Sequence, residues 1–309
     1  MRCVLGFDGG GTKTDCVLMD ETGAVLARSR SGSSNPTTFG VQTALDAVVE
    51  AAGKALNEGR KPAADVAFVL AGISGAGESA MRAALVEGLQ PKFPNAAIQI
   101  TSDLVLSLAA TGEIPSLVVI AGTGSAVLGR TSPLEMARAG GFGPVIGDPG
   151  SAYDIGRKTA ALCFQRQLDG WAFPLGKKIL GELSCSFNEL FDNARVKPGV
   201  VFPKLFQIAA GAAESGDSDS RALLSSAAAD LRDQARHVIE KLNLRDANFF
   251  VAKTGGVFDG SPYLNAQFDA MMREAAPHVR LGSLPRTVAE AAALLARDAL
   301  KSPLVLEAS

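Results

Sequence analysis

Residues 4–20, VLGFDGGGTKTDCVLMD, bring a carboxylate, three consecutive glycines, a hydroxyl and a lysine into one short segment. Asp8 ends an apolar run, the glycines at 9–11 follow it, and Thr12 and Lys13 come next. Glycine lets a ligand approach the main chain, and successive N–H groups in such a turn bind phosphate. A carboxylate at a strand end suits Mg2+ held through water, because this ion keeps most of its waters. The segment therefore predicts an anion-binding turn, and an ordinary glycine-rich hairpin is the open alternative.

Two familiar phosphate motifs do not fit this turn. A Walker A loop has glycine directly before its lysine and opens a helix, whereas Thr12 precedes Lys13 and a β-rich run follows. A Rossmann fingerprint also needs a strand-to-helix turn. The segment therefore indicates a strand, a turn and a second strand.

The elements that position this turn follow a pattern that occurs twice. In the first copy, strands are expected at 4–7, 14–19, 24–30, 65–70 and 98–101, and helices from Thr37 or Thr38 to 57, at 78–89 and at 104–110. In the second copy, strands are expected at 117–121, 126–130, 134–139, 248–253 and 279–281, and helices at 151–167, after 257 and at 287–300. Extra helices are expected over about 171–242.

This repetition predicts two similar α/β lobes. We expect an N-terminal lobe at 1–115 and a C-terminal lobe at 116–309 with a helical insertion over about 171–242, and we expect the last residues to pack back on the N-terminal lobe. If the lobes face each other, the turns at 9–12 and 122–125 can bind one polyphosphate from two sides of a cleft. One GTGS sequence alone is typical of a plain hairpin.

Composition excludes several classes of protein. The chain has 309 residues, 47% of them hydrophobic, and a net charge of −2. Its dispersed Lys and Arg give no basic surface for nucleic acid. The longest uncharged apolar stretch, 116–129, is too short to span a bilayer, and the N-terminal residues lack a signal-peptide core. The chain has four cysteines, Cys3, Cys16, Cys163 and Cys185, and none of them forms a CxxC pair. A zinc-binding or redox role is therefore not expected. We therefore expect a cytoplasmic protein with neither nucleic-acid nor membrane partners.

Several motifs together resemble a known group. DGGGTKT, AGTGS and TGGV (254–257) are similar to the phosphate and adenosine motifs of the actin, sugar kinase and chaperone superfamily. GFDGGGTKTDCVL, ITSDLVLSLAAT, IAGTGS and GDPGSAYDIG resemble the N-acetylglucosamine kinase branch of the BadF/BadG/BcrA/BcrD ATPase family. The resemblance covers nearly the whole chain and is weakest over 171–242. It implies two ribonuclease H-like lobes, the actin-like ATPase fold, with a nucleotide cleft between them.

The resemblance also implies a role for each matching residue. Asp8 would orient Mg2+ through water, and Asp103 would be the catalytic carboxylate. Asn35 and Asp148 would bind the sugar, together with Asp103. The remaining positions would contact ATP: Gly10, Gly11, Thr12 and Lys13 at the β- and γ-phosphates, Thr123 and Gly124 at the phosphates from the other lobe, and Gly255 and Gly256 at the adenosine.

The chain departs from the family pattern at three places. Pro149 stands where related kinases have an acid in GDEGS, and Ala126 stands where some have asparagine. Relatives that accept N-acetylglucosamine can carry a tryptophan shortly after the matching asparagine, whereas residues 36–38 here are Pro-Thr-Thr. These differences leave phosphoryl transfer intact and leave the identity of the sugar open.

Residue chemistry is consistent with the proposed roles but does not require them. Asp103 lies between a strand and a helix, so it can accept a proton from a sugar hydroxyl or simply cap the helix. Asp148 and Asn35 are residue types that suit turns, so a structural role in a turn explains them as well as sugar binding does. Lys13 would also suit a solvated strand. For His237, His278 and Trp171 we expect structural roles.

The expected function is ATP- and Mg2+-dependent phosphorylation of an amino sugar, N-acetylglucosamine to its 6-phosphate, with Asp103 as general base. Glucosamine and N-acetylmuramic acid are alternative acceptors. Another alternative is the ATPase that drives electron transfer in radical dehydratases or benzoyl-CoA reductase, and a third is a sugar sensor without catalysis. Apolar stripes over 202–242 and 289–300 suit either a homodimer face or an internal core.

Overall fold

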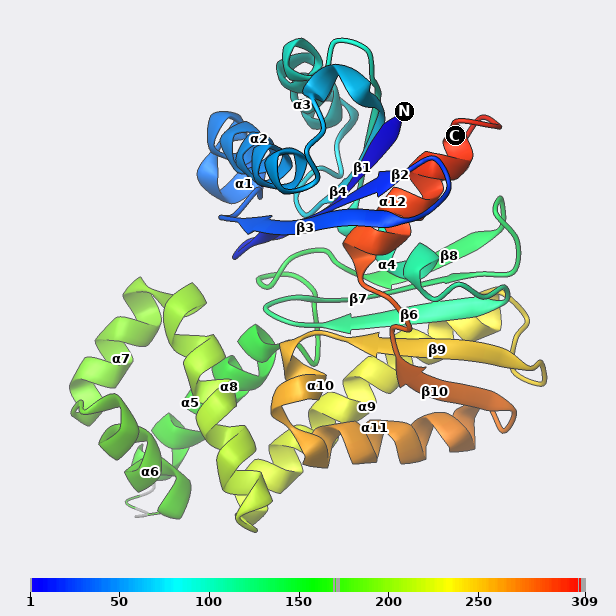
Figure 1. Cartoon of the computed structure of the whole chain (residues 1–309). Helices are drawn as coiled ribbons and strands as arrows, with labels where there is room; N and C mark the ends of the chain where they lie inside the picture. The colour runs from blue at the N-terminus through cyan, green and yellow to red at the C-terminus, as the bar shows by residue number, and fades with distance from the viewer. Residues whose placement is uncertain (1, 169, 171–172, 305, 307–309) are drawn as a thin grey trace. The chain divides into compact units, whose positions relative to one another are not determined.

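The computed structural model describes residues 2–168, 170, 173–304 and 306. It divides into two compact units, each built on one five-stranded sheet (Figure 1). Unit 1 contains Met1–Glu113, Ser132–Glu135 and Leu284–Ser309. Unit 2 contains Ile114–Thr131 and Met136–Ser283.

The sheet of unit 1 has the strand order β3-β2-β1-β4-β5. Its first three strands form an antiparallel meander, and the last two run parallel to β1. The strands are β1 (Cys3–Gly9), β2 (Thr14–Asp20), β3 (Val25–Ser31), β4 (Val66–Ile73) and β5 (Ala97–Thr101). The helices are α1 (Pro36–Phe39), α2 (Val41–Glu58), α3 (Ser79–Leu89), α4 (Asp103–Ala110) and α12 (Val288–Ala299), with 3-10 turns η1 (Ala63–Asp65) and η2 (Gln90–Lys92).

Alternation along β1 places apolar side chains on both faces of this sheet. Leu5 and Phe7 pack with α2 and α3, whereas Val4 packs with α4 and α12. Figure 1 shows these two pairs of helices on opposite faces of the sheet. Gly6 lies directly under α12: a Cβ there would be 2.1 Å from the backbone nitrogen of Ala293. The last long helix of the chain is therefore part of the core of unit 1.

The sheet of unit 2 repeats the pattern, with the order β10-β9-β6-β7-β8. Again the first three strands are antiparallel and the last two run parallel to the first. The strands are β6 (Ser116–Ala121), β7 (Ser125–Arg130), β8 (Met136–Gly140), β9 (Phe249–Thr254) and β10 (Val279–Ser283). The helices are α5 (Ala152–Leu168), α6 (Pro174–Leu183), α7 (Phe187–Val196), α8 (Pro198–Glu214), α9 (Ser218–Lys241), α10 (Gly256–Gly260) and α11 (Pro262–Ala275). The predicted duplication of an α/β lobe is confirmed.

The apolar stripes of the later helices are buried within their own units. Helices α9 and α11 cover the sheet of unit 2, and α5 to α8 form a second cluster beside it. Helix α12 is buried in unit 1. Of the two interpretations of these stripes, internal packing accounts for their buried residues.

Some local predictions need correction. The helix expected from Thr37 or Thr38 to 57 is two helices, because Gly40 has φ of 85° and interrupts it, and Asn35 rather than a threonine caps the first. Cys185 lies between α6 and α7, not within a helix. Trp171 lies outside the described residues.

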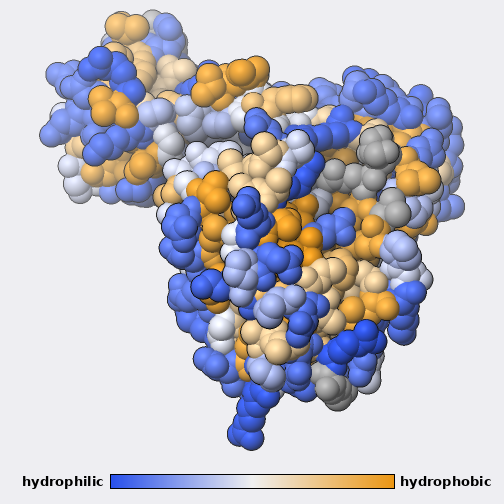
Figure 2. Space-filling view, turned by 90° about the horizontal axis from the view of Figure 1, so that it is seen from above, coloured by the Kyte–Doolittle hydropathy of each residue, from blue (hydrophilic) through white to orange (hydrophobic). Residues whose placement is uncertain are grey.

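In the described part of the chain, no helix is long and apolar enough to cross a membrane. On the face seen in Figure 2, hydrophilic and hydrophobic residues are interspersed.

Candidate active site

Two carboxylates lie close together at one edge of the unit 1 sheet. Asp8 in β1 pairs with Gly72 in β4, which pairs with Thr101 at the end of β5. These three parallel strands therefore end at the same edge, where ligands bind in open α/β sheets. Asp103 follows β5 and begins α4. Burial, and then the charge of Asp103, raise the pKa of Asp8 to about 6.

This pair fits a magnesium ion bound largely through water. Mg2+ usually takes one or two carboxylates together with substrate phosphates. In the described part of the chain, no three His, Cys, Asp or Glu side chains are grouped to hold a metal. The mutual repulsion that raises the pKa of Asp8 is what a divalent cation would relieve.

Asp103 is not the N-cap of its helix. Ser102 caps α4 by accepting a hydrogen bond from the Val105 amide, and Asp103 is the first helical residue. One carboxylate oxygen of Asp103 accepts from the Leu104 amide at 2.9 Å. Gly72 in β4 lets the start of α4 lie close to this strand, because a Cβ on Gly72 would be 3.3 Å from the Asp103 Cα.

The first glycine turn combines one packed glycine with two open ones. A Cβ on Gly9 would be 2.2 Å from the Ser34 hydroxyl, so Gly9 is needed for packing. On Gly10 it would meet only the Lys13 carbonyl, at 3.7 Å, and on Gly11 it would meet no described atom within 4 Å. The turn is closed by a 2.9 Å hydrogen bond from the Gly10 amide to the Lys13 carbonyl. The exposed main chain of Gly11 is therefore open to a ligand, next to the exposed Thr12, whereas the Gly10 amide is already bonded within the turn.

Lys13 is half exposed and paired with an acid. Its ammonium lies 2.8 Å from a carboxylate oxygen of Asp15, which also binds Arg30. Burial opposes ionisation of Asp15, but hydrogen bonds from Arg30 and Lys13 outweigh it and lower its pKa. Lys13 would have to exchange this partner for a phosphate.

Asn35, the predicted sugar ligand, is also a helix cap. Its side-chain oxygen accepts hydrogen bonds from the amides of Thr37 and Thr38, at 3.0 and 3.1 Å, and from the Thr37 hydroxyl. Within the described residues, the side-chain NH2 group of Asn35 makes no hydrogen bond. The cap thus fixes the side chain and leaves two N–H donors for a ligand.

In unit 2 the second glycine turn is attached to the start of α5. The carbonyl oxygens of Gly122 and Thr123 accept from the amides of Ala152 and Tyr153, at 2.8 and 3.4 Å. The predicted Gly124 faces protein, because a Cβ there would be 2.4 Å from an Asp148 carboxylate oxygen. Gly122, which belongs to the predicted turn but has no individual predicted role, has no described atom within 4 Å of its Cβ position.

Asp148 is buried and has φ of 58°, an uncommon value for a residue other than glycine. Burial raises its pKa, and hydrogen bonds from backbone amides, those of Gly143 and Ser125 among them, act in the opposite direction. The Gly143 amide lies 3.3 Å from its carboxylate. Asp148 therefore joins the loop before α5 to the second glycine turn, whether or not it also binds sugar.

Pro149 contributes a backbone carbonyl where related kinases have an acid. That carbonyl accepts from the Ser125 hydroxyl at 2.8 Å and from the Gln234 side chain at 2.9 Å. Gln234 lies in α9, far along the chain, so no local pattern indicated its contact with the turn. It is a positioning residue that the sequence motifs do not contain.

The two glycines of TGGV have different surroundings. Gly255 has φ of 108°, and a Cβ there would be 2.4 Å from the Ala121 carbonyl oxygen. Gly256 begins α10, and no described residue approaches its Cβ position within 4 Å. Gly255 therefore packs against the end of β6, and Gly256 is the one that leaves main chain open.

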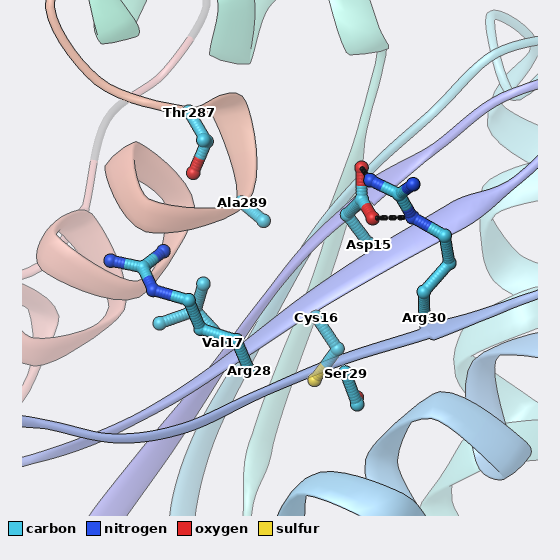
Figure 3. A pocket seen from close by; sticks show the side chains of 8 residues that line it. All are labelled: Asp15, Cys16, Val17, Arg28, Ser29, Arg30, Thr287 and Ala289. Atoms are coloured by element: carbon cyan, nitrogen blue, oxygen red, sulfur yellow. Dashed lines mark hydrogen bonds and ion pairs between the residues drawn. The ribbon is translucent and has the colours of Figure 1, made fainter.

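A cavity of about 410 Å³ lies elsewhere in unit 1, against β2, β3 and the start of α12 (Figure 3). Figure 3 shows Asp15 and Arg30 pointing toward each other at its edge. The lining residues are Asp15, Cys16, Val17, Arg28, Ser29, Arg30, Thr287 and Ala289. None of them is a predicted site residue, so cavity shape and residue chemistry indicate different places. We assign the site by the paired carboxylates, which can hold Mg2+, and by the glycine turn, whose N–H groups can bind phosphate.

Comparisons with known proteins show which proteins the chain resembles as a whole. The chain is 28% identical to the N-acetylmuramic acid/N-acetylglucosamine kinase of Clostridium acetobutylicum, over 96% of this chain and 99% of that protein. It is 28% identical to the N-acetyl-D-glucosamine kinase of Dictyostelium discoideum, over 96% and 98%. Its fold is similar to that of a candidate N-acetylglucosamine kinase from Chromobacterium violaceum, with a TM-score of 0.75 and 24% identity over 95% and 98% of the two chains. Residues 5–292 match the BadF/BadG/BcrA/BcrD ATPase family, and the chain therefore belongs to that family.

Proposed function

We propose that this protein is an ATP-dependent kinase that phosphorylates the 6-hydroxyl of N-acetylglucosamine. The observation that carries the proposal is the pairing of Asp8 and Asp103 near a glycine turn in which the main chain of Gly11 is exposed. Phosphoryl transfer needs alignment, charge neutralisation and a proton acceptor rather than covalent help from the protein. The names of the two relatives above support an amino sugar as the acceptor.

Asp103 is the general base of the proposed mechanism. One of its carboxylate oxygens is bound to the Leu104 amide, which fixes the orientation of the group. The second oxygen would align the sugar hydroxyl and accept its proton as the bond to phosphorus forms. Asp8 would hold Mg2+ through water, and the ion would neutralise charge on the phosphates.

We assign the other contacts with ATP and sugar from the chemistry of each residue and from the space around it. We assign the ATP phosphates to Gly10, Gly11, Thr12 and Lys13 in unit 1 and to Thr123 and Gly124 in unit 2. To these we add Gly122, which has open space at its Cβ position. Gly255 and Gly256 are assigned to the adenosine. Asn35 and Asp148 are assigned to the sugar, with the side-chain NH2 group of Asn35 as the hydrogen-bond donor.

The alternative role as an electron-transfer activator requires cysteines that can hold an iron–sulfur cluster. Cys3, Cys16 and Cys163 are buried and free, and Cys185 is partly exposed and free. Burial raises the pKa of the first three well above that of an ordinary thiol. A buried thiol that resists ionisation is a poor cluster ligand, so the thiols favour the kinase.

The proposal is tested by measuring ADP release with N-acetylglucosamine, glucosamine, N-acetylmuramic acid, N-acetylmannosamine and glucose. We expect release to depend on Mg2+ and to be fastest with N-acetylglucosamine, with 6-phosphate as the product by NMR. No sugar-dependent release with any of the five would refute the kinase. Faster release with another amino sugar would refute only the assigned acceptor, and bound iron in the purified protein would support the activator.

A further inference from the structure

The segment that carries Asn35 is hydrogen-bonded directly to the first glycine turn. We call residues Ser31–Asn35 the sugar loop and residues Gly9–Lys13 the phosphate turn. The Gly10 carbonyl oxygen accepts from the Ser33 hydroxyl at 3.0 Å and from the Ser34 amide at 3.1 Å. A single carbonyl of the phosphate turn therefore holds two successive residues of the sugar loop.

The Ser33 hydroxyl also contacts the predicted sugar ligand. It accepts a hydrogen bond from the backbone amide of Asn35 at 3.3 Å while it donates to the Gly10 carbonyl oxygen. A serine hydroxyl can donate once and accept at the same time, so both bonds can exist together. Ser33 is thus the one side chain in this loop that connects Asn35 to Gly10.

Packing around this connection leaves little room for the loop to move alone. Ser34 is fully buried, and its hydroxyl occupies the space where a Cβ of Gly9 would lie. The Thr14 hydroxyl donates to the Gly32 carbonyl at 2.8 Å, which fixes the loop to the strand after the turn. The Gly9 carbonyl is held from the other side by the Ser74 amide, also at 2.8 Å. A displacement of Asn35 would therefore be transmitted to Gly10.

We propose that Ser33 is a positioning residue that couples sugar binding to nucleotide binding in this enzyme. The inference rests on the proposed function, because it requires Asn35 to bind the sugar and the phosphate turn to bind ATP. A ligand that orders Asn35 also orders Gly10 through the Ser33 hydroxyl, so the second ligand meets a turn that is already in place. By linkage the effect is reciprocal: ATP increases the affinity for sugar by the same factor.

The quantity that tests this is a coupling factor, not an affinity. It is the dissociation constant of a non-hydrolysable ATP analogue without sugar, divided by that with saturating N-acetylglucosamine, measured by titration calorimetry. Couplings between two sites are typically about 5- to 150-fold. Because a neutral hydrogen bond contributes about 0.5–1.5 kcal/mol, Ser33→Ala should lower this factor about 2- to 12-fold.

Ser31→Ala is the matched control. The Ser31 hydroxyl donates to the Ala47 carbonyl in α2 at 2.6 Å, so the variant loses a bond of the same type in the same loop without touching Gly10. Ser33→Ala should fold, because the Gly10 carbonyl keeps the Ser34 amide as donor. Ser33→Cys, whose thiol is a weak donor of similar size, should also lower the coupling factor. Ser33→Thr keeps a hydroxyl donor and should retain the wild-type factor.

A lowered factor in Ser33→Ala or Ser33→Cys, with wild-type factors in Ser31→Ala and Ser33→Thr, would support the inference. An unchanged factor in Ser33→Ala, or an equal loss in Ser31→Ala, would overturn it. Wild-type protein that binds sugar and nucleotide independently would overturn the inference and leave the kinase intact. Wild-type protein that binds no sugar at all would remove the proposed function, and the inference with it.

Discussion

Replacing the two glycines of TGGV one at a time should separate a packing role from a ligand-binding role. Gly255 and Gly256 are adjacent, and the sequence motif assigns both to the adenosine. Their surroundings differ, because only Gly255 has a positive φ and a crowded Cβ position. We expect Gly255→Ala to lower the free energy of unfolding and Gly256→Ala to leave it nearly unchanged.

The size of the first effect follows from two contributions. Backbone at φ of 108° and ψ of 158° is essentially restricted to glycine, and alanine there costs about 1–3 kcal/mol. The new Cβ would also lie 2.4 Å from the Ala121 carbonyl oxygen, and overpacking of this kind costs about 1–3 kcal/mol. The contact is with backbone at the end of β6, which cannot rotate away. Gly255→Ala should therefore destabilise the protein by about 2–6 kcal/mol.

The effect at Gly256 should be small or favourable. In the described part of the structure no atom lies within 4 Å of its Cβ position, and it is the first residue of α10. Alanine is a better helix former than glycine by up to about 1 kcal/mol. If adenosine lies against this main chain, however, the added methyl group would occupy its place. Gly256→Ala should then raise the KM for ATP several-fold at normal stability.

Urea unfolding at fixed pH measures the stability of both variants, and steady-state kinetics measures KM for ATP and for sugar. Equal unfolding midpoints for Gly255→Ala and wild type would refute the packing argument. A normal KM for ATP in Gly256→Ala would remove that residue from the adenosine site.

Three further predictions follow from unit 1. Asp103→Asn should lower kcat, measured by ADP release, at least about 100-fold. The control Asp46→Asn, on the exposed side of α2, should leave kcat unchanged. A near-normal kcat in Asp103→Asn would remove Asp103 from the mechanism. Because folding raises the pKa of Asp8 from 3.8 to about 6, this residue binds more protons in the folded protein than in the unfolded chain between these values, so its contribution to stability falls as pH rises through them. Asp8→Asn should flatten this fall in urea midpoints compared at pH 4 and 7, and an unchanged slope would contradict the assignment. Gly6→Ala should cost about 1–3 kcal/mol or more against the backbone of α12, while Gly53→Ala, with open space around it, should not destabilise; equal midpoints would contradict the packing.

Sequence patterns predicted the fold because its signals are local. The alternation of the strands and the glycine turn after Asp8 lie within short segments, and the same succession of elements recurs in the second copy. The structure confirms two similar lobes, each with a five-stranded sheet. The placement of Asp103 between a strand and a helix was equally local. Even there, the choice of Ser102 as the cap depended on hydrogen bonds that the pattern leaves open.

Tertiary structure decided which residues of each motif are free to meet a ligand. Gly124 faces Asp148 and Gly255 faces β6, whereas Gly122 and Gly256 have open space at their Cβ positions, and the sequence motif does not distinguish these glycines. The contact of Gln234 with Pro149 likewise joins residues far apart in the chain. Such contacts depend on which helix covers which strand and at what register. That is settled by packing the whole core, so a local segment cannot encode it alone.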